Sequence, residues 1–380
     1  MRDRLVLVTA LLVATATLGG FAAPAAAAQP DATYETCEFP VTMTDATGEE
    51  ITLEEPPERV TTTNPSAAQT MWEIGGASQV VGVTQYAMYL DGADEKTDVS
   101  AERGVDVEKV AGTEPDLVLA PNASAGQVQA LRDAGLTVFH FPEAKTTDDI
   151  AQKTTTIGKL TGNCEGAART NAWMNANVEA VSNVTAGEDR PRVLYPLGSG
   201  FVAGGDTFIN ATFTLAGTNN TAATVADGYP QISDEVVLEL DPEWIVVNSR
   251  GDSALDEEPY ASTTAGEEGN AVYLEVHWLN QPAPASVVNT IHDMTRQVHG
   301  DVYDNSTYVE RSEISVAAES EAGAETDTET AGETTEPPVT TEMPETTDGG
   351  ASGDSAPGFG AVVALVALVG SALAATRLRP

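Results

Sequence analysis

The chain has 380 residues, and 58 Asp and Glu against 18 Lys and Arg give it a formal net charge of -40. A surface of this charge repels nucleic acids and anionic membranes, so proteins that bind them are excluded. The acidic excess is typical of a protein that works in very high salt, where ions screen the self-repulsion. Hydrophobic residues make up 41% of the chain, which indicates packed domains rather than a fully disordered polymer.

The N-terminus has the layout of a secretory signal peptide. Arg2 and Arg4 precede an apolar stretch at 5–18, and small residues stand at Ala26 and Ala28. This pattern predicts export and cleavage after residues 1–28.

Between residues 59 and 141, short β-rich runs alternate with helical runs. The expected strands are 59–64, 79–84, 116–121 and 137–141, and the expected helices are 66–76, 105–112 and 124–135. Such alternation predicts a parallel sheet with flanking helices. We therefore assign residues 29–145 to an N-terminal α/β lobe.

Residues 146–187 are predicted to be an all-helical connection. A first helix stops at Gly162, and Asn163 can N-cap a second helix that runs to about Val184. A helix of about 21 residues spans roughly 30 Å, the width of a small lobe. A single rigid crossing helix predicts lobes that tilt by a few degrees rather than close fully.

The same alternation restarts at 192 and continues to 300, which assigns residues 188–308 to a second α/β lobe. The predicted fold class is thus α/β, with two lobes of mainly parallel sheets joined by one long interlobe helix. Residues 309–355 are rich in Glu and Thr and predict a disordered acidic stalk, with threonines that are candidates for O-glycosylation.

The C-terminal residues 356–380 contain an uncharged hydrophobic run at 358–375, followed by Arg377 and Arg379. The run has about the length at which a helix begins to span a bilayer, and basic residues mark the cytoplasmic side. This pattern predicts a C-terminal anchor that leaves the rest of the chain on the extracellular face of the membrane.

Two cysteines, Cys37 and Cys164, remain after the predicted cleavage. Outside the cell such a pair favours a disulfide over two free thiols. Closing so long a loop contributes about 4–5 kcal/mol in the chain-entropy model. Five sequons are glycosylation candidates on an exported chain, at Asn122, Asn183, Asn210, Asn219 and Asn305.

The usual enzyme signatures GxSxG, HExxH, CxxC and the phosphate loop do not occur in the sequence. The four histidines are scattered, which favours surface or core histidines over a metal site, and no cofactor or metal is expected. Several aromatic residues instead follow predicted strands, at the edge where open α/β sheets bind ligands. The candidate ligand-binding residues are Tyr86, Tyr89, Phe201 in a loop, Tyr229 and Trp278, with Arg250 as a basic residue after a strand.

Blocks in order along 58–301 resemble the substrate-binding proteins of iron-siderophore and cobalamin ABC importers. They include RVTTTNPSAAQTMWEIGGASQVVGVTQY, VDVEKVAGTEPDLVLAP, GGDTFINATFTLAGTNN and HWLNQPAPASVVNTI. The resemblance implies a non-enzymatic protein that holds a metal chelate between two lobes. A corrinoid is favoured over a ferric siderophore because Tyr86, Tyr229 and Trp278 match aromatic positions of the cobalamin-binding members. A binding protein for another small ligand and a surface structural or adhesion protein remain the alternatives.

The resemblance also implies partners. Glu108 and Glu235 match the glutamates, one on each lobe, that dock with an ABC permease dimer and its ATPase. Acidic residues are also favoured at helix N-termini by the dipole, so a purely structural role is the alternative. The tail resembles the archaeal PGF-type sorting signal at Pro357, Gly358 and Phe359, which implies processing by an archaeosortase and replacement of the hydrophobic run by a lipid. A retained membrane helix is the alternative.

Overall fold

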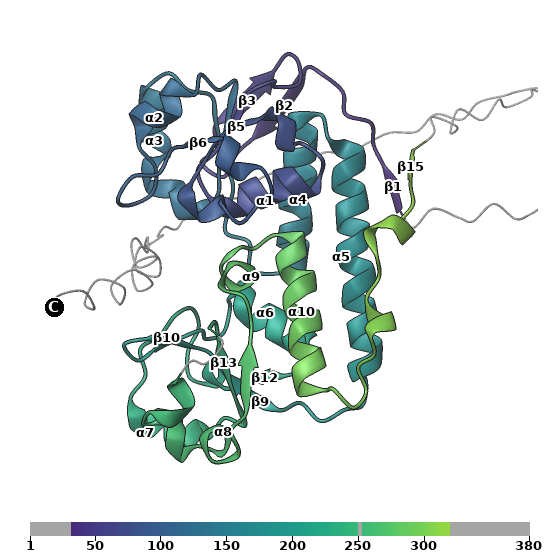
Figure 1. The fold of residues 1–380 in the computed structure, drawn as a ribbon. Coiled ribbons are helices and arrows are strands. Elements are labelled where there is room, and N and C mark those ends of the chain that lie inside the picture. The colour runs from purple at the N-terminus through teal and green to yellow at the C-terminus, as the bar shows by residue number, and fades with distance from the viewer. Residues whose placement is uncertain (1–31, 250–252, 320–380) are drawn as a thin grey trace, which may run out of the picture.

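The computed structural model describes residues 32–249 and 253–319. Two α/β lobes lie one above the other, and long helices run beside both of them (Figure 1). This arrangement confirms the predicted fold class. None of the helices within the described ranges is long and apolar enough to cross a membrane, and the predicted anchor at 358–375 lies outside them.

The first lobe is built on a parallel sheet of five strands. Its order is β6 (Thr97–Asp98), β5 (Val80–Val83), β4 (Val60–Thr62), β7 (Leu117–Ala120) and β8 (Val138–His140). Four of these strands lie in the expected runs, whereas the two-residue β6 was not expected. The central strands β4 and β7 are fully buried, as expected for a parallel sheet that is covered on both faces. The helices of this lobe are α1 (Pro65–Glu73), α2 (Val107–Gly112) and α3 (Val128–Asp133), and an antiparallel hairpin, β2 (Val41–Thr44) and β3 (Glu50–Leu53), packs beside them.

The second lobe repeats this plan with a parallel sheet of four strands. Its order is β12 (Asn219–Asn220), β9 (Arg192–Leu194), β13 (Trp244–Val247) and β14 (Ala271–Tyr273). Its helices are α6 (Phe208–Leu215), α7 (Asp234–Leu240), α8 (Thr264–Glu268), α9 (Val276–Asn280) and α10 (Pro284–Val298). Phe201, expected in a loop, lies instead in β11 (Phe201–Val202), which pairs with β10 (Pro196–Gly198).

Two antiparallel helices, α4 (Thr147–Thr161) and α5 (Cys164–Thr185), connect the lobes. Ala167 of α5 packs in the first-lobe core, whereas Trp173 and Val181 pack in the second-lobe core. The crossing helix is therefore α5, and α4 lies alongside it in both cores. A Cβ atom on Gly166 would overlap the carbonyl oxygen of Ile74, so glycine at this position allows α5 to approach the end of α1.

The predicted N-cap of the crossing helix is only partly correct. Asn163 occupies the N-cap position of α5, but its side chain makes no capping hydrogen bond. Its amide instead donates to Gln79 Oε1 at 2.7 Å and to Thr161 Oγ1 at 2.9 Å. These bonds fix the tight turn between α4 and α5 against the first lobe.

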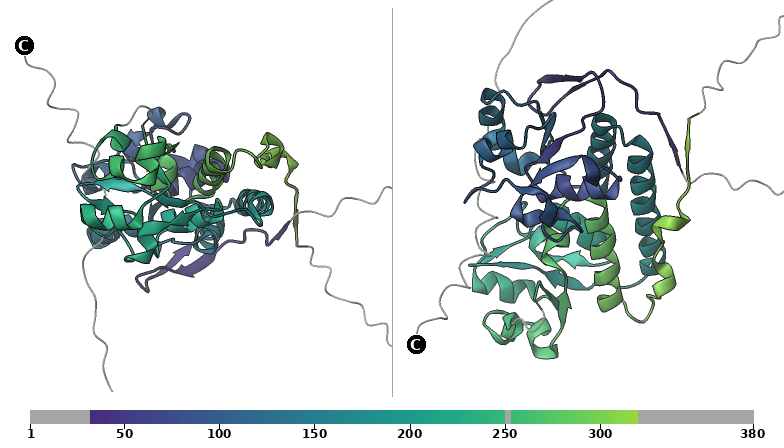
Figure 2. Two further views of the ribbon diagram at one scale, coloured as in Figure 1. Left: turned by 90° about the horizontal axis from the view of Figure 1, so that it is seen from below. Right: turned by 45° about the horizontal axis from the view of Figure 1, so that its top comes forward.

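The two ends of the described chain meet beside α5. The predicted disulfide between Cys37 and Cys164 is present, and β1 (Ala32–Tyr34) pairs in parallel with β15 (Val316–Ala318). In Figure 2 this pair lies on the far side of α5 from the sheets. We call residues 301–319 the C-terminal strap.

The strap corrects the predicted start of the stalk. Residues 309–319 were assigned to a disordered stalk, yet they form η9 (Arg311–Glu313) and β15. The guanidinium of Arg311 lies 3.8 Å from the Trp173 ring centroid, and Trp173 Nε1 donates to the Val309 carbonyl at 2.8 Å. Contacts with α5 therefore order a segment whose composition alone predicted disorder.

Candidate functional site

Three aromatic side chains meet where the two lobes touch. Tyr89 follows β5 and η2 (Gln85–Ala87) in the first lobe, whereas His277 and Trp278 lie in α9, after β14 of the second lobe. The Tyr89 ring stacks on His277 with centroids 4.5 Å apart and an interplanar angle of 21°, and it meets Trp278 edge to face at 6.1 Å. We call these three residues the aromatic bridge. The segments that follow the carboxyl ends of β5 and β14 therefore meet, as in the ligand sites of open α/β sheets.

Exposed apolar side chains flank the aromatic bridge on both lobes. Tyr86, in the first lobe, is 52% exposed, and Val276, in the second, is 42% exposed. Large apolar side chains left in water beside partly buried rings offer a surface for an apolar-faced ligand.

The bridge is electrically neutral around pH 7. Burial, and then the nearby Glu73 carboxylate, raise the pKa of the Tyr89 phenol. Burial lowers the pKa of His277, and the Glu275 carboxylate opposes that shift only in part. Neutral rings favour stacking on an uncharged face over binding of a small anion.

A buried polar cluster lies behind the bridge. It joins α1 of the first lobe to α4 and to the N-terminus of α10 in the second lobe, and we call it the lobe junction: Gln69, Glu73, Lys153, Ala285 and Ser286. The N-cap residue of α10 is Ala283, which has no side chain that could cap the helix. Glu73 supplies the missing acceptor from the other lobe, since its carboxylate oxygens accept from the Ala285 N–H at 3.0 and 3.2 Å.

Two basic side chains balance the Glu73 carboxylate: Lys153 within the lobe junction and Arg311 beside it. Arg311 of the strap lies 3.4 Å from Glu73, and the Lys153 ammonium donates to the Pro282 carbonyl and, at 3.4 Å, to the Ser66 hydroxyl. Burial raises the pKa of Glu73, which Arg311 opposes. Burial lowers the pKa of Lys153 to about 7, and the Glu73 charge opposes that shift. Opposite charges and backbone dipoles thus compensate each other where water is excluded.

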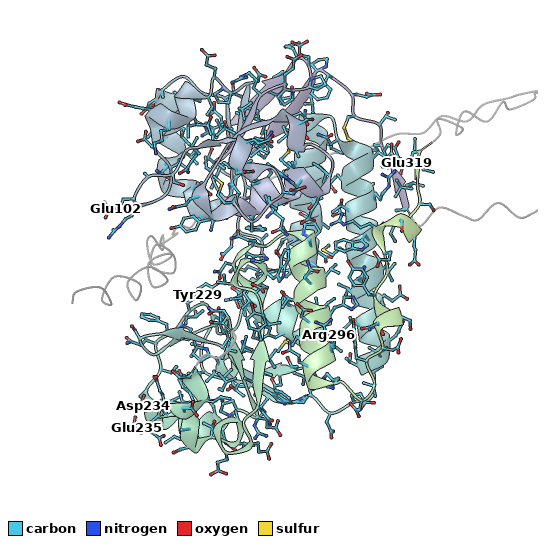
Figure 3. All side chains as sticks on the ribbon, viewed as in Figure 1. Glu102, Tyr229, Asp234, Glu235, Arg296 and Glu319 are labelled. Carbon is cyan, nitrogen blue, oxygen red and sulfur yellow. A yellow bond between two sulfur atoms is a disulfide. The ribbon has the colours of Figure 1, made fainter. Side chains whose placement is uncertain are left out.

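Tyr229 lies on the second lobe, on the side that faces the first (Figure 3). Burial raises its pKa, and the charge of Glu143 adds to this effect. Lys145, in the segment that leads from β8 into α4, lies 3.5 Å from Glu143 and 2.6 Å from Asp206 of the second lobe. A second, more exposed polar contact thus joins the lobes near Tyr229.

The structure brings together only part of the predicted ligand set. Tyr89 and Trp278 touch, and Tyr86 lies three residues from Tyr89. Within the described residues, neither Phe201 nor Tyr229 makes a ring contact with the aromatic bridge. Arg250 lies outside the described residues.

Sequence reasoning missed His277, which it grouped with the scattered histidines. The useful signal was its place directly before Trp278 and after a strand. The other histidines have ordinary roles: His140 Nδ1 bonds the Ala120 carbonyl, His292 bonds two side chains, and His299 Nε2 bonds the Gly217 carbonyl. Between 32 and 319, apart from the undescribed 250–252, no group of His, Cys, Asp or Glu is arranged to hold a metal ion.

The two glutamates predicted to dock lie in exposed first turns of helices. Glu108 lies in the first turn of α2, where Asp106 caps the helix through the Glu108 and Lys109 N–H groups. Glu235 lies in the first turn of α7, and a hydrogen bond with Ser233 lowers its pKa. Both helices lie on the side of the molecule away from α5, one at each end (Figures 1 and 3). Their placement is what a two-point contact with a partner would need.

The candidate glycosylation sites differ in accessibility. Asn183, Asn219 and Asn305 are exposed, whereas Asn122 and Asn210 are partly buried. Asn210 Oδ1 also lies 3.3 Å from the Asn220 amide. The exposed three are the better placed to carry a glycan.

A cavity of about 530 Å³ lies elsewhere, between α5 and β1. Its lining includes Glu35, Asn171 and Glu319, and it shares no residue with the aromatic bridge. We place the candidate ligand site at the bridge because strand ends and exposed apolar side chains of both lobes meet there.

Comparisons with known proteins agree with this architecture. A family model described as periplasmic binding protein matches residues 60–275, and a model described as the PGF-CTERM motif matches residues 356–378. The chain is 43% identical over 309 residues to the cobalamin-binding protein of Halobacterium salinarum, covering 76% of this chain and 84% of that protein.

Solved structures show the same fold. The periplasmic vitamin B12 binding protein BtuF of Vibrio cholerae superposes with a TM-score of 0.57 at 23% identity, covering 64% of this chain and 97% of that one. The periplasmic heme-binding protein RhuT of Roseiflexus superposes with a TM-score of 0.57 at 22% identity, covering 63% and 98%.

Proposed function

The chain belongs to the periplasmic binding protein family, and from this premise we propose that it captures a corrinoid between its lobes and delivers it to an ABC permease. The aromatic bridge carries the proposal, because rings from both lobes meet at the edge of the sheets where a ligand of this fold binds. The similarity to a cobalamin-binding protein from a halophilic archaeon supports a corrinoid over other chelates.

The neutrality of the bridge supports the same ligand class. A corrin macrocycle offers a broad apolar face, which can stack on aromatic rings and cover Tyr86 and Val276. A carboxylate-rich ferric chelate would require basic side chains instead, and the described bridge contains none. In this proposal Tyr86, Tyr89, Tyr229 and Trp278 contact the ligand, with His277 as an addition from the structure. Phe201 and Arg250 stay predicted contacts that rest on the sequence alone.

The sorting motif supports a location on the outer face of the membrane. We propose that the tail is cut near Pro357-Gly358-Phe359, that a lipid then anchors the chain, and that Glu108 and Glu235 dock on the permease. Mass spectrometry of protein extracted from the membrane tests the cut. Recovery of the intact C-terminal peptide would indicate a retained helix.

Titration of the purified protein with cyanocobalamin and with ferric hydroxamates, in molar salt, tests the ligand. We expect quenching of tryptophan fluorescence by cyanocobalamin. Replacing Trp278 with Ala should weaken binding roughly tenfold or more, because a stacked aromatic contact is lost. Trp244→Phe is the control. Trp244 begins β13 and so lies at the amino ends of the strands, whereas the aromatic bridge lies beyond their carboxyl ends. Saturation by the hydroxamate alone would replace the corrinoid with a siderophore.

A further inference from the structure

The side chain of Gln69 connects the aromatic bridge with the lobe junction. It belongs to α1 and is only 2% exposed. Its Oε1 accepts from the Tyr89 hydroxyl at 2.5 Å, and its Nε2 donates to Glu73 Oε1 at 2.7 Å. The Ser286 hydroxyl of α10 lies 3.1 Å from Nε2 and 3.3 Å from Oε1. One buried amide therefore contacts a ligand-facing ring, a buried carboxylate and the second lobe.

The chemistry of the neighbours fixes the orientation of this amide. The Glu73 carboxylate can only accept, so the amide nitrogen must face it. The carbonyl oxygen is then left for the Tyr89 hydroxyl, which must donate. Burial and the Glu73 charge keep the phenol protonated, as this donor role requires.

We propose that Gln69 is the positioning residue for Tyr89. It sets the orientation of the Tyr89 ring according to the position of the second lobe. The inference rests on the proposed function, in which Tyr89 contacts the ligand. Tyr89 is held at two points: the first lobe holds its hydroxyl through Gln69, and His277 of the second lobe covers its ring.

The Gln69 amide is also linked to the position of the second lobe, through Ser286 and Glu73. Ser286 lies in the first turn of α10, whose N-terminus is capped by Glu73, and Glu73 also accepts from Gln69. A shift of α10 against α1 therefore disturbs the two hydrogen-bond partners that orient the Gln69 amide. The position of the Tyr89 hydroxyl follows, since a bond of this length tolerates little displacement.

A ligand-free measurement tests the positioning itself. Gln69→Met keeps the side-chain volume and removes both polar atoms, while Tyr89→Phe removes the hydroxyl alone. The near-ultraviolet circular dichroism of Trp278, identified by its loss in Trp278→Phe, should change alike in both variants. Ser286→Ala removes the contact of Gln69 with α10 but keeps its bonds to Glu73 and Tyr89, so it should change this band less than Gln69→Met does. An unchanged band in Gln69→Met would overturn the inference, whatever ligand the protein binds.

A double-mutant cycle with cyanocobalamin tests the consequence. We expect Gln69→Met and Tyr89→Phe each to raise Kd about tenfold, the value of one well-formed hydrogen bond to a buried group. The double variant should bind no more weakly than either single variant, because both act through the same bond. A multiplied loss of roughly hundredfold would show that Gln69 acts independently of Tyr89 and would overturn the inference.

The two proposals fail in different ways. If the wild-type protein binds no corrinoid, the proposed function fails, and the circular dichroism of the ligand-free variants alone decides the role of Gln69. If corrinoid binds with the wild-type affinity in Gln69→Met, the proposed function stands and the positioning role fails.

Discussion

The lobe junction and the outer helix ends each hold glutamates, yet these carboxylates differ in burial and in the partners that they contact. Glu73 is buried, accepts the Ala285 N–H of α10 with both carboxylate oxygens and faces Arg311. Glu108 and Glu235 stand exposed at the starts of α2 and α7. The Glu73 carboxylate is already hydrogen-bonded inside the fold, whereas the carboxylates of Glu108 and Glu235 are exposed and can contact a partner.

The contrast shows how an acidic protein can keep its lobes in register in high salt. At molar ionic strength the Debye length is about 3 Å, so contacts between exposed charges are largely screened. A buried contact is screened much less, because ions do not enter it. Loss of a buried contact should therefore cost more stability in molar salt than loss of an exposed one.

The largest effect is expected from Glu73→Ala. The change removes the cap of α10 and leaves Arg311 and Lys153 without their shared carboxylate, so the free energy of unfolding should fall by about 3–5 kcal/mol. Denaturant unfolding in molar salt measures this loss of stability. The matched control is Glu165→Ala on α5, whose carboxylate is 53% exposed and pairs with Arg169. A loss for Glu73→Ala no larger than the control's would show that the junction contributes no more than a surface pair.

A second buried contact predicts a pH dependence. His292 of α10 lies between Asn177 of α5 and Tyr303 of the strap, with Nε2 donating to Asn177 Oδ1 at 2.8 Å and Nδ1 accepting from the Tyr303 hydroxyl at 2.9 Å. Burial, and then the Arg296 charge, lower its pKa to about 4. The edge of the Tyr308 ring also faces it. The folded protein therefore holds this imidazole neutral at pH values where the unfolded chain protonates it.

The sign of the effect follows from this depressed pKa. The stabilisation is fully present above about pH 6.5 and is lost as the pH falls towards 4, by up to about 3 kcal/mol. Between pH 7 and pH 5 this imidazole should lower the free energy of unfolding by about 2 kcal/mol, and the total fall should be smaller by that amount in His292→Gln. An equal fall in the variant would assign the pH dependence to other groups.

A smaller effect is expected at the exposed contact between the lobes. Lys145 and Asp206 are 2.6 Å apart, but their side chains are 34% and 58% exposed. Asp206→Asn should cost less than about 1 kcal/mol at the lowest salt concentration at which the protein stays folded, and nothing measurable in molar salt. Asparagine suits the left-handed backbone at this position, where φ is 50°. A loss of stability in Asp206→Asn that does not change with salt concentration would show that the Lys145–Asp206 pair is shielded like the buried contacts.

The sequence allowed the fold to be predicted because its signals are local. Alternating short β-rich and helical runs were sufficient for both sheets apart from the two-residue edge strands β6 and β12. An even pair of cysteines in an exported chain was sufficient for the disulfide. The strap was missed because its order depends on Arg311 meeting Trp173, which is 138 positions away in the chain.

The candidate site was predicted only where its residues follow strands. Tyr89 and Trp278 could be named from that placement. Glu73 and Ala285 are 212 positions apart, and a buried glutamate inside a helical pattern looks like any other helical glutamate. Gln69 was missed for the same reason, since two of its three partners, Tyr89 and Ser286, are 20 and 217 positions away in the chain. His277 could have been found from its place after a strand and directly before Trp278, but its scattering among the other histidines pointed away from a site.

The smallest effect on stability, and the largest on transport, is expected for Glu108 and Glu235. Neither carboxylate lies in a buried contact, so Glu108→Ala and Glu235→Ala should change the free energy of unfolding by less than about 0.5 kcal/mol. Ligand affinity should also be unchanged, because both helices lie away from the aromatic bridge. Binding of the protein to permease in membranes should nevertheless weaken, and uptake should fall.

The magnitude of that loss distinguishes a contact from long-range attraction. In molar salt an exposed pair contributes almost nothing, so a measurable loss requires that the carboxylates become desolvated against the partner, where one pair can be worth several kcal/mol. The double variant should therefore lose more than either single variant, since each lobe makes its own contact. Glu165→Ala combined with Glu179→Ala, on α5, removes the same charge from the opposite side and should leave uptake intact. Normal uptake in the Glu108 and Glu235 double variant would leave both residues as acids that stabilise only their own helix ends.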